Sequence, residues 1–119
     1  MKGLAAYQET TIATENKGRL IVMLYDGAIK FLKLAIKEME ARNFEEKGRY
    51  INKAQDIINE LNTVLDMEAG GEIAVNLRKL YFFITRHLAK ANSQNNPQLV
   101  QEVISLLEEL NNGWKAITR

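Results

Sequence analysis

The stretch "LIVMLYDGAIKFL", residues 20–32, decides the fold class, because it is helical in pattern yet has almost no polar face. We expect a helix from Lys17 to Arg42, and on a wheel at about 100° per residue its polar arc is narrow. This arc holds Asp26, Lys30, Lys33 and Lys37. Apolar residues occupy nearly all of the remaining surface. Because a bundle helix buries only a third to a half of its surface, this segment needs several neighbours to cover it.

The apolar residues of this helix divide into a core row and two flanks. The expected core row is Ile21, Leu24, Ala28, Leu32, Ala35 and Met39. One flank holds Val22, Tyr25, Ile29 and Ile36, and the other holds Leu20, Met23, Phe31 and Leu34. Contiguous exposed apolar surface costs solubility, and burying it gains roughly 25 cal/mol per Å². The flanks therefore indicate a further covering element or a partner.

Three more segments of helical period follow the first. We predict helices over residues 44–67, 72–92 and 97–117, with Gly70 and Gly71 closing the second. Asn16, Asn43 and Asn96 are the expected N-caps, and Pro97 is suited to the first helical position after Asn96. Short loops force consecutive long helices to lie antiparallel. The sequence thus predicts an all-α, antiparallel up-and-down four-helix bundle (residues 16–119) preceded by a short N-terminal cap or leader segment (residues 1–15).

The other helices differ in how much apolar surface they carry. The expected core rows are Ile51, Ala54, Ile58, Leu61 and Leu65 in the second, Ile73, Leu77, Leu80, Tyr81, Ile84 and Leu88 in the third, and Leu99, Val103, Leu106, Leu107, Leu110, Trp114 and Ile117 in the fourth. Tyr50, Ile57 and Val64 form a shoulder beside the second row, and Val75, Phe82 and Ala89 form a stripe opposite the third row. A bundle cannot bury both faces of the third helix.

Composition excludes several functional classes. The 119 residues carry 16 Lys plus Arg against 15 Asp plus Glu, a net charge of +1, so no overall field attracts nucleic acid. The absence of Cys excludes disulfides and Cys-ligated metal sites. No stretch resembles a signal peptide or a membrane span of roughly 20 apolar residues. We therefore expect a cytosolic protein with no nucleic-acid partner and no insertion into a membrane.

No constellation of residues predicts an enzyme. The sequence shows no nucleophile and base pair, glycine-rich phosphate loop or metal-ligand cluster, so we predict no catalytic residue, metal or cofactor. The lone His87 has Lys90 three residues later, which leaves a histidine phosphotransfer domain as a remote alternative, although the small-residue signature after the Lys is missing. A di-iron bundle is excluded because it needs two Glu-x-x-His pairs, and Ile84 stands three residues before His87. Asp26 and Lys30 are expected to form a surface pair.

The excess apolar surface has two interpretations. The leader, with Leu4, Tyr7 and Ile12, can fold back over one flank, or the chain can form a homodimer. Alternatively, a groove between the helices accepts amphipathic helices of another chain through apolar residues at i, i+3, i+4 and i+7 spacing. Both interpretations hold together if the leader is a displaceable cover.

Short motifs along nearly the whole chain indicate a resemblance to a known protein family. They are "AYQ" at 6–8, "LYDGAIKF" at 24–31, "KAQDIINEL" at 53–61, "LDMEAGGEIAVNL" at 65–77, "LY" at 80–81, "AN" at 91–92 and "LLEELNNGW" at 106–114. In their order and spacing the chain resembles the FliS family of flagellar secretion chaperones. The resemblance implies a cytosolic helical bundle that binds the disordered C-terminal segment of flagellin. It also implies that the chaperone blocks premature polymerisation and delivers its cargo to the flagellar type III export apparatus.

The flanks and stripes supply the candidate cargo-binding residues. These are Tyr7, Val22, Tyr25, Ile29, Ile36, Tyr50, Ile57, Val64, Val75, Phe82 and Ala89. By analogy with the family, the leader carrying Tyr7 lies over the flank of the first helix and gives way when cargo arrives. A self-associating bundle or adaptor without flagellin cargo is the more serious alternative, and it includes a homodimer of the cargo-free chain.

Overall fold

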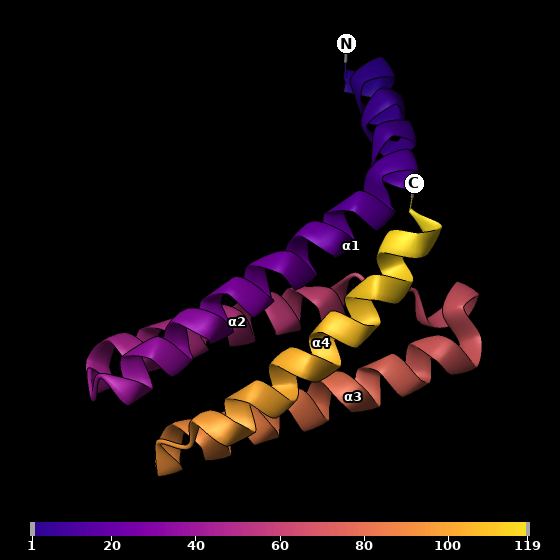
Figure 1. Cartoon of the computed structure of the whole chain (residues 1–119). Coiled ribbons are helices and arrows are strands. Elements are labelled where there is room, and N and C mark those ends of the chain that lie inside the picture. Colours follow the sequence, from indigo (N-terminus) through magenta and orange to yellow (C-terminus); the bar gives the residue numbers. More distant parts are fainter. Residues whose placement is uncertain (1, 119) are drawn as a thin grey trace.

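Four helices make up the chain, as the computed structural model describes it for the backbone of residues 2–118 and the side chains of residues 17–118. They are α1 (Lys2–Glu40), α2 (Phe44–Thr63), α3 (Met67–Gln94) and α4 (Pro97–Ile117). Helix α1 packs against α2 and α4, and α3 packs against the same two helices from the other side (Figure 1). No strand occurs within residues 2–118. The predicted all-α four-helix bundle is confirmed.

Helix α1 begins earlier than the sequence predicted. It is continuous from Lys2, so Asn16 lies inside the helix and the expectation that it caps the N-terminus is wrong. Residues 4–16 contain neither Gly nor Pro, and nothing in them stops helical hydrogen bonding. The first turns of α1 extend past the other three helices (Figure 1). The side chain of Tyr7, proposed above as a cargo contact, lies outside the described side chains.

The junction between α2 and α3 also differs from the prediction. Helix α2 ends at Thr63 rather than Met67, and α3 starts at Met67 because the Asp66 carboxylate accepts the backbone N–H of Ala69 at 2.9 Å. The expected break at the glycine pair is present, but as a kink inside α3, where Gly71 has φ 53° and ψ −130°. A residue with a side chain rarely adopts this conformation, which is why glycine stands there.

Asparagines occupy the N-cap positions of the other two helices, α2 and α4, as predicted. Asn96 caps α4 through its side-chain oxygen, which accepts the N–H of Gln98 at 3.0 Å, and Pro97 opens the helix as predicted. Asn43 occupies the N-cap position of α2, yet its side chain makes no capping bond and instead donates to Glu38 at 2.8 Å. The three short connections, residues 41–43, 64–66 and 95–96, place consecutive helices antiparallel.

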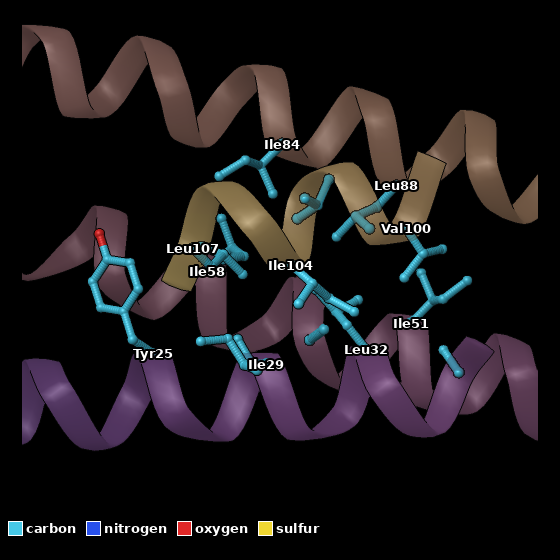
Figure 2. Packing of buried hydrophobic residues seen from close by; sticks show 14 of the residues in the cluster. Tyr25, Ile29, Leu32, Ile51, Ile58, Ile84, Leu88, Val100, Ile104 and Leu107 are labelled. Carbon is cyan, nitrogen blue, oxygen red and sulfur yellow. The ribbon is translucent and has the colours of Figure 1, made fainter. Parts of the chain in front are cut away.

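One hydrophobic core runs the length of the bundle, and all four helices contribute to it (Figure 2). Most residues of the expected core rows are buried, among them Ala28, Leu32, Ile51, Ile58, Ile84, Leu88, Val103 and Leu107. Val100 and Ile104 are also buried, although the wheel of the fourth helix did not assign them.

Two residues expected in the core are on the surface. Ile73, two residues after the kink at Gly71, is 71% exposed, and Ile117, the last residue of α4, is 76% exposed. Conversely, Tyr25 and Ile29, predicted on an exposed flank, are buried and point into the core in Figure 2. Their assignment to an open flank is wrong.

Candidate functional site

The outer face of α3 carries exposed apolar side chains. Val75 is 40% exposed and Phe82 is 51% exposed, and Ala89 is exposed in line with them. These three residues stand opposite the core residues Leu77, Ile84 and Leu88 of the same helix. The exposure predicted for Val75, Phe82 and Ala89 is therefore confirmed, and we call these three residues together with the neighbouring Phe83 the α3 stripe.

Phe83, which is 44% exposed, joins this surface although the sequence analysis did not select it. It lies next to Phe82 in the chain and on the side of α3 that faces α4, where its ring stacks on His87 at 5.0 Å between centroids. Its adjacency to Phe82 is the sequence signal that could have identified it. Phe83 thus widens the exposed apolar surface of α3 from the predicted stripe toward α4.

A second apolar feature is a pocket of about 380 Å³ at the end of the bundle that α1 enters. Its lining comes from α1, α2, the start of α3 and the last turns of α4, and comprises Lys17, Gly18, Ile21, Leu61, Val64, Leu65, Asp66, Ala69, Gly70, Ile73, Ala74, Leu77, Tyr81 and Trp114. Among these, only Val64 was selected from the sequence as a candidate contact. The pocket depends on the kink at Gly71, which turns the first residues of α3 away from the bundle axis, and no pattern in the sequence fixes that direction.

Tyr25 and Tyr81 meet beneath this pocket. Their hydroxyl oxygens are 2.7 Å apart, and Tyr25 is 0% exposed while Tyr81 reaches the pocket wall. Burial raises the pKa of Tyr25, which the hydrogen bond with Tyr81 offsets in part. Burial is also the main reason that the pKa of Tyr81 is raised. The pair is thus a neutral, buried link between α1 and α3.

This link predicts a loss of stability at alkaline pH. Because both folded pKa values are raised above the unfolded value near 10, the stabilisation is complete below about pH 10. It declines as the pH rises further, since the unfolded chain releases protons that the folded chain retains. We expect the free energy of unfolding, measured in urea at pH 9 and pH 11, to fall less in the double variant Tyr25→Phe/Tyr81→Phe. An identical fall in both proteins would contradict the role of the pair.

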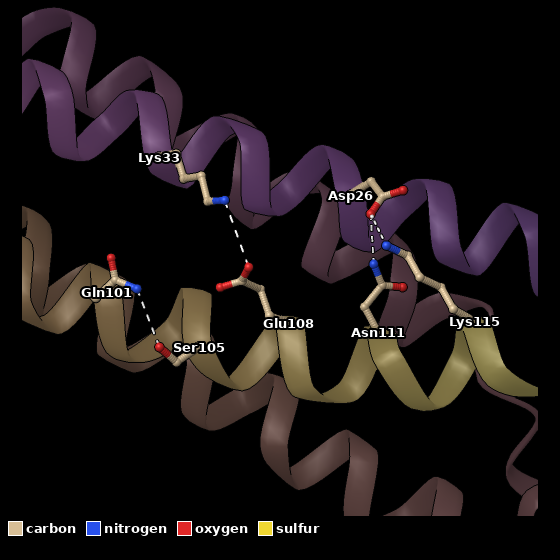
Figure 3. A network of polar contacts seen from close by, with 7 residues as sticks. All are labelled: Asp26, Lys33, Gln101, Ser105, Glu108, Asn111 and Lys115. Carbon is tan, nitrogen blue, oxygen red and sulfur yellow. Dashed lines mark hydrogen bonds and ion pairs between the residues drawn. The ribbon is translucent and has the colours of Figure 1, made fainter.

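The flank of α1 that includes Val22 and Ile36 is covered by α4. These two side chains are half-buried. Polar contacts join α1 to α4 (Figure 3). Asp26 accepts a hydrogen bond from Asn111 at 2.8 Å and lies 3.5 Å from the Lys115 ammonium. The expected partner of Asp26 was Lys30, so that prediction is wrong, because α4 offers two donors to the same carboxylate.

The opposite flank of α1 is covered only in part: Phe31 and Leu34 are half-buried, whereas Leu20 is 47% exposed and Met23 is 68% exposed. The ring of Phe31 stacks on Tyr50 at 6.2 Å between centroids. A Cβ added to Gly27 would lie 3.3 Å from Ile57, so the glycine permits close approach of the two helices. The shoulder Tyr50, Ile57 and Val64 is accordingly half-buried against the core. Among the candidate contacts of α1 and α2 whose side chains are described, none presents the open surface that the α3 stripe presents.

His87 has a structural partner. Its Nε2 lies 2.6 Å from the Glu102 carboxylate, and the contact joins α3 to α4. Among the described residues, no group of three or more His, Cys, Asp or Glu is arranged to hold a metal ion. No described helix is long and apolar enough to cross a membrane. The α3 stripe and the pocket at the bundle end are apolar surfaces open to a partner, as are the exposed side chains of Leu20 and Met23 on α1.

Comparisons with known proteins agree with this picture. A family profile described as "Flagellar protein FliS" matches residues 1–119. The chain is similar to the flagellar secretion chaperone FliSB of Pseudomonas aeruginosa, with 39% identity over 122 aligned residues that cover 99% of the chain and 97% of the relative. It is also similar to the flagellar secretion chaperone FliS of Salmonella typhimurium, with 39% identity over 121 residues that cover 98% of the chain and 90% of the relative.

A more distant relative extends the comparison. The flagellar secretion chaperone FliS of Bacillus subtilis is 34% identical over 110 residues, which cover 92% of the chain and 81% of the relative. All three relatives are named as chaperones, and none as an enzyme. The prediction that the chain is not an enzyme is confirmed on this ground.

Proposed function

The chain belongs to the FliS family of flagellar secretion chaperones, and from this we propose that it binds the disordered C-terminal segment of flagellin in the cytosol. In this role it prevents premature polymerisation of flagellin and delivers it to the flagellar type III export apparatus. The proposed cargo comes from the family resemblance, and the surface of the bundle supports it. The proposed function requires no cofactor and no chemical change in flagellin.

The observation that carries the proposal is the exposed apolar surface of α3. Val75, Phe82 and Phe83 stand on a helix whose opposite face already fills the core, so no further helix of the described bundle covers them. An amphipathic helix of another chain can cover such a face through residues spaced i, i+3, i+4 and i+7. Ordering a disordered segment costs free energy, so useful affinity requires a large contact area. The pocket at the bundle end adds to that area.

The candidate contacts differ in what binding requires of them. The α3 stripe is accessible as it stands, while Val22, Ile36, Tyr50, Ile57 and Val64 are half-buried and offer only their edges. Tyr25 and Ile29 would have to leave the core, so we no longer propose them as contacts. Tyr7 remains a proposed contact on the first turns of α1. Because these turns continue the helix past the other three helices, the expectation that the leader folds back over the flank of α1 is wrong, and we no longer propose that cargo displaces it.

Co-purification tests the proposal directly. The chain is coexpressed with flagellin of the same organism, either complete or lacking its C-terminal segment, and purified through a tag on the chain. We expect complete flagellin to be retained and the truncated form to be lost. Retention of both forms would contradict binding through the C-terminal segment. Light scattering distinguishes the alternative, because a self-associating bundle keeps the same oligomeric mass whether or not flagellin is added.

A further inference from the structure

Beyond its apolar residues, the α3 stripe stands in a strongly basic stretch of the chain. Residues 73–101 contain no Asp or Glu, whereas they contain four Lys or Arg residues, namely Arg78, Lys79, Arg86 and Lys90. Lys79, Arg86 and Lys90 are exposed. Helix α3 also contains Glu68 and Glu72, but both lie in its first turns around the kink, so the four cations give residues 73–101 a local charge of +4.

The basic residues alternate with the apolar ones on one helix face. Lys79 lies four residues after Val75 and three before Phe82, and Arg86 lies four residues after Phe82. Side chains three or four positions apart on a helix are neighbours, so both cations flank the exposed ring of Phe82.

Carboxylates of the described chain do not neutralise these cations. The ion pairs among residues 17–118 join Lys33 with Glu108, Arg49 with Glu46, His87 with Glu102, and Lys115 with Asp26. Lys79, Arg86 and Lys90 take part in none of them. The carboxylate at the α3–α4 seam, Glu102, is held by His87 at 2.6 Å. The face therefore presents apolar side chains together with uncompensated positive charge.

We propose that the outer face of α3 receives an acidic amphipathic helix of the cargo. Its apolar residues, spaced seven apart, cover Val75, Phe82 and Ala89, and its carboxylates lie beside Lys79 and Arg86. This inference rests on the proposed function and deepens it by naming the chemical character of the docked segment. Charged groups around an apolar contact accelerate encounter and select among partners.

The spacing of the face favours a protein helix over other anionic partners. Val75, Phe82 and Ala89 recur every seven residues, which is the repeat by which one helix packs along another. A phosphate backbone requires rows of cations and gains nothing from this apolar repeat. The phenyl rings could insert into an anionic bilayer whatever their spacing along the helix.

Charge reversal with a matched control tests the proposal. The variant Lys79→Glu/Arg86→Glu reverses two charges seven residues apart on α3, and Lys30→Glu/Lys37→Glu does the same on the polar arc of α1, where both lysines are exposed. Binding of a labelled peptide with the sequence of the flagellin C-terminal segment is measured by fluorescence anisotropy at 50 mM and 500 mM salt. We expect the α3 variant to bind about tenfold more weakly at low salt and the α1 control to change less than twofold.

The salt dependence supplies a second readout. Binding by the unaltered chain should weaken as salt rises, and this dependence should be smaller in the α3 variant, because screening acts on the charges that it lacks. Thermal unfolding checks that both variants remain folded. Equal affinity of the two variants would overturn the charge inference alone, whereas no binding by the unaltered chain would overturn the proposed function with it. Binding to anionic vesicles that only the α3 variant loses, with peptide binding unchanged, would assign the face to a membrane and overturn the proposal.

Discussion

Phe82→Asp is expected to weaken binding of the flagellin C-terminal segment at least about 30-fold, which corresponds to about 2 kcal/mol. The side chain of Phe82 is half exposed in the unbound chain, and a docked helix would bury this exposed part. Replacing it with Asp removes this apolar contact and places an unpaired charge in the interface. Because the side chain contributes little to the core, the free energy of unfolding should change by less than about 0.5 kcal/mol.

The control for this experiment is Asn76→Asp. Asn76 is exposed on the same helix, so the substitution adds the same charge without removing apolar surface. We expect its affinity for the segment to stay within about threefold of the unaltered chain, measured by the same anisotropy assay. Equal losses in the two variants would mean that charge, rather than the phenyl ring, determines binding. A large loss of thermal stability in Phe82→Asp alone would instead show that Phe82 supports the fold.

The helical elements could be predicted because their signals are local. Asn96 followed by Pro97 fixes the start of α4, and the apolar period of 3.6 residues identifies each core row. Gly71 was recognised as a break, but the cap supplied by Asp66 was not, so the break was placed at the end of α2 instead of inside α3. The structure uses both signals, since Asp66 starts α3 and Gly71 kinks it five residues later.

The candidate site was predicted where one face of a helix lies opposite its own core row. That condition holds for Val75 and Phe82 on α3, and both are exposed as expected. Helix α1 has no such single core row, because apolar residues surround most of it. The helical wheel therefore does not show which of its sides pack against neighbouring helices. Because α4 approaches over Asp26, the flank carrying Tyr25 and Ile29 became core. The pocket at the bundle end could not be predicted, as it depends on how four chain segments converge.

Ile29→Asp is therefore expected to unfold the protein rather than to abolish cargo binding selectively. Ile29 belongs to the core cluster and is 9% exposed, so the variant places an unpaired carboxylate among apolar side chains, at a cost above about 4 kcal/mol. The matched variant Ile29→Val keeps the site apolar and should lower the free energy of unfolding by only about 0.5–1.5 kcal/mol. Urea unfolding followed by circular dichroism measures both, and the Val variant should bind the flagellin segment as the unaltered chain does. If the Asp variant instead kept its full stability and lost only its affinity, Ile29 would belong to the binding surface, and the cargo would have to reach the α1–α4 interface that Asp26 and Asn111 now close.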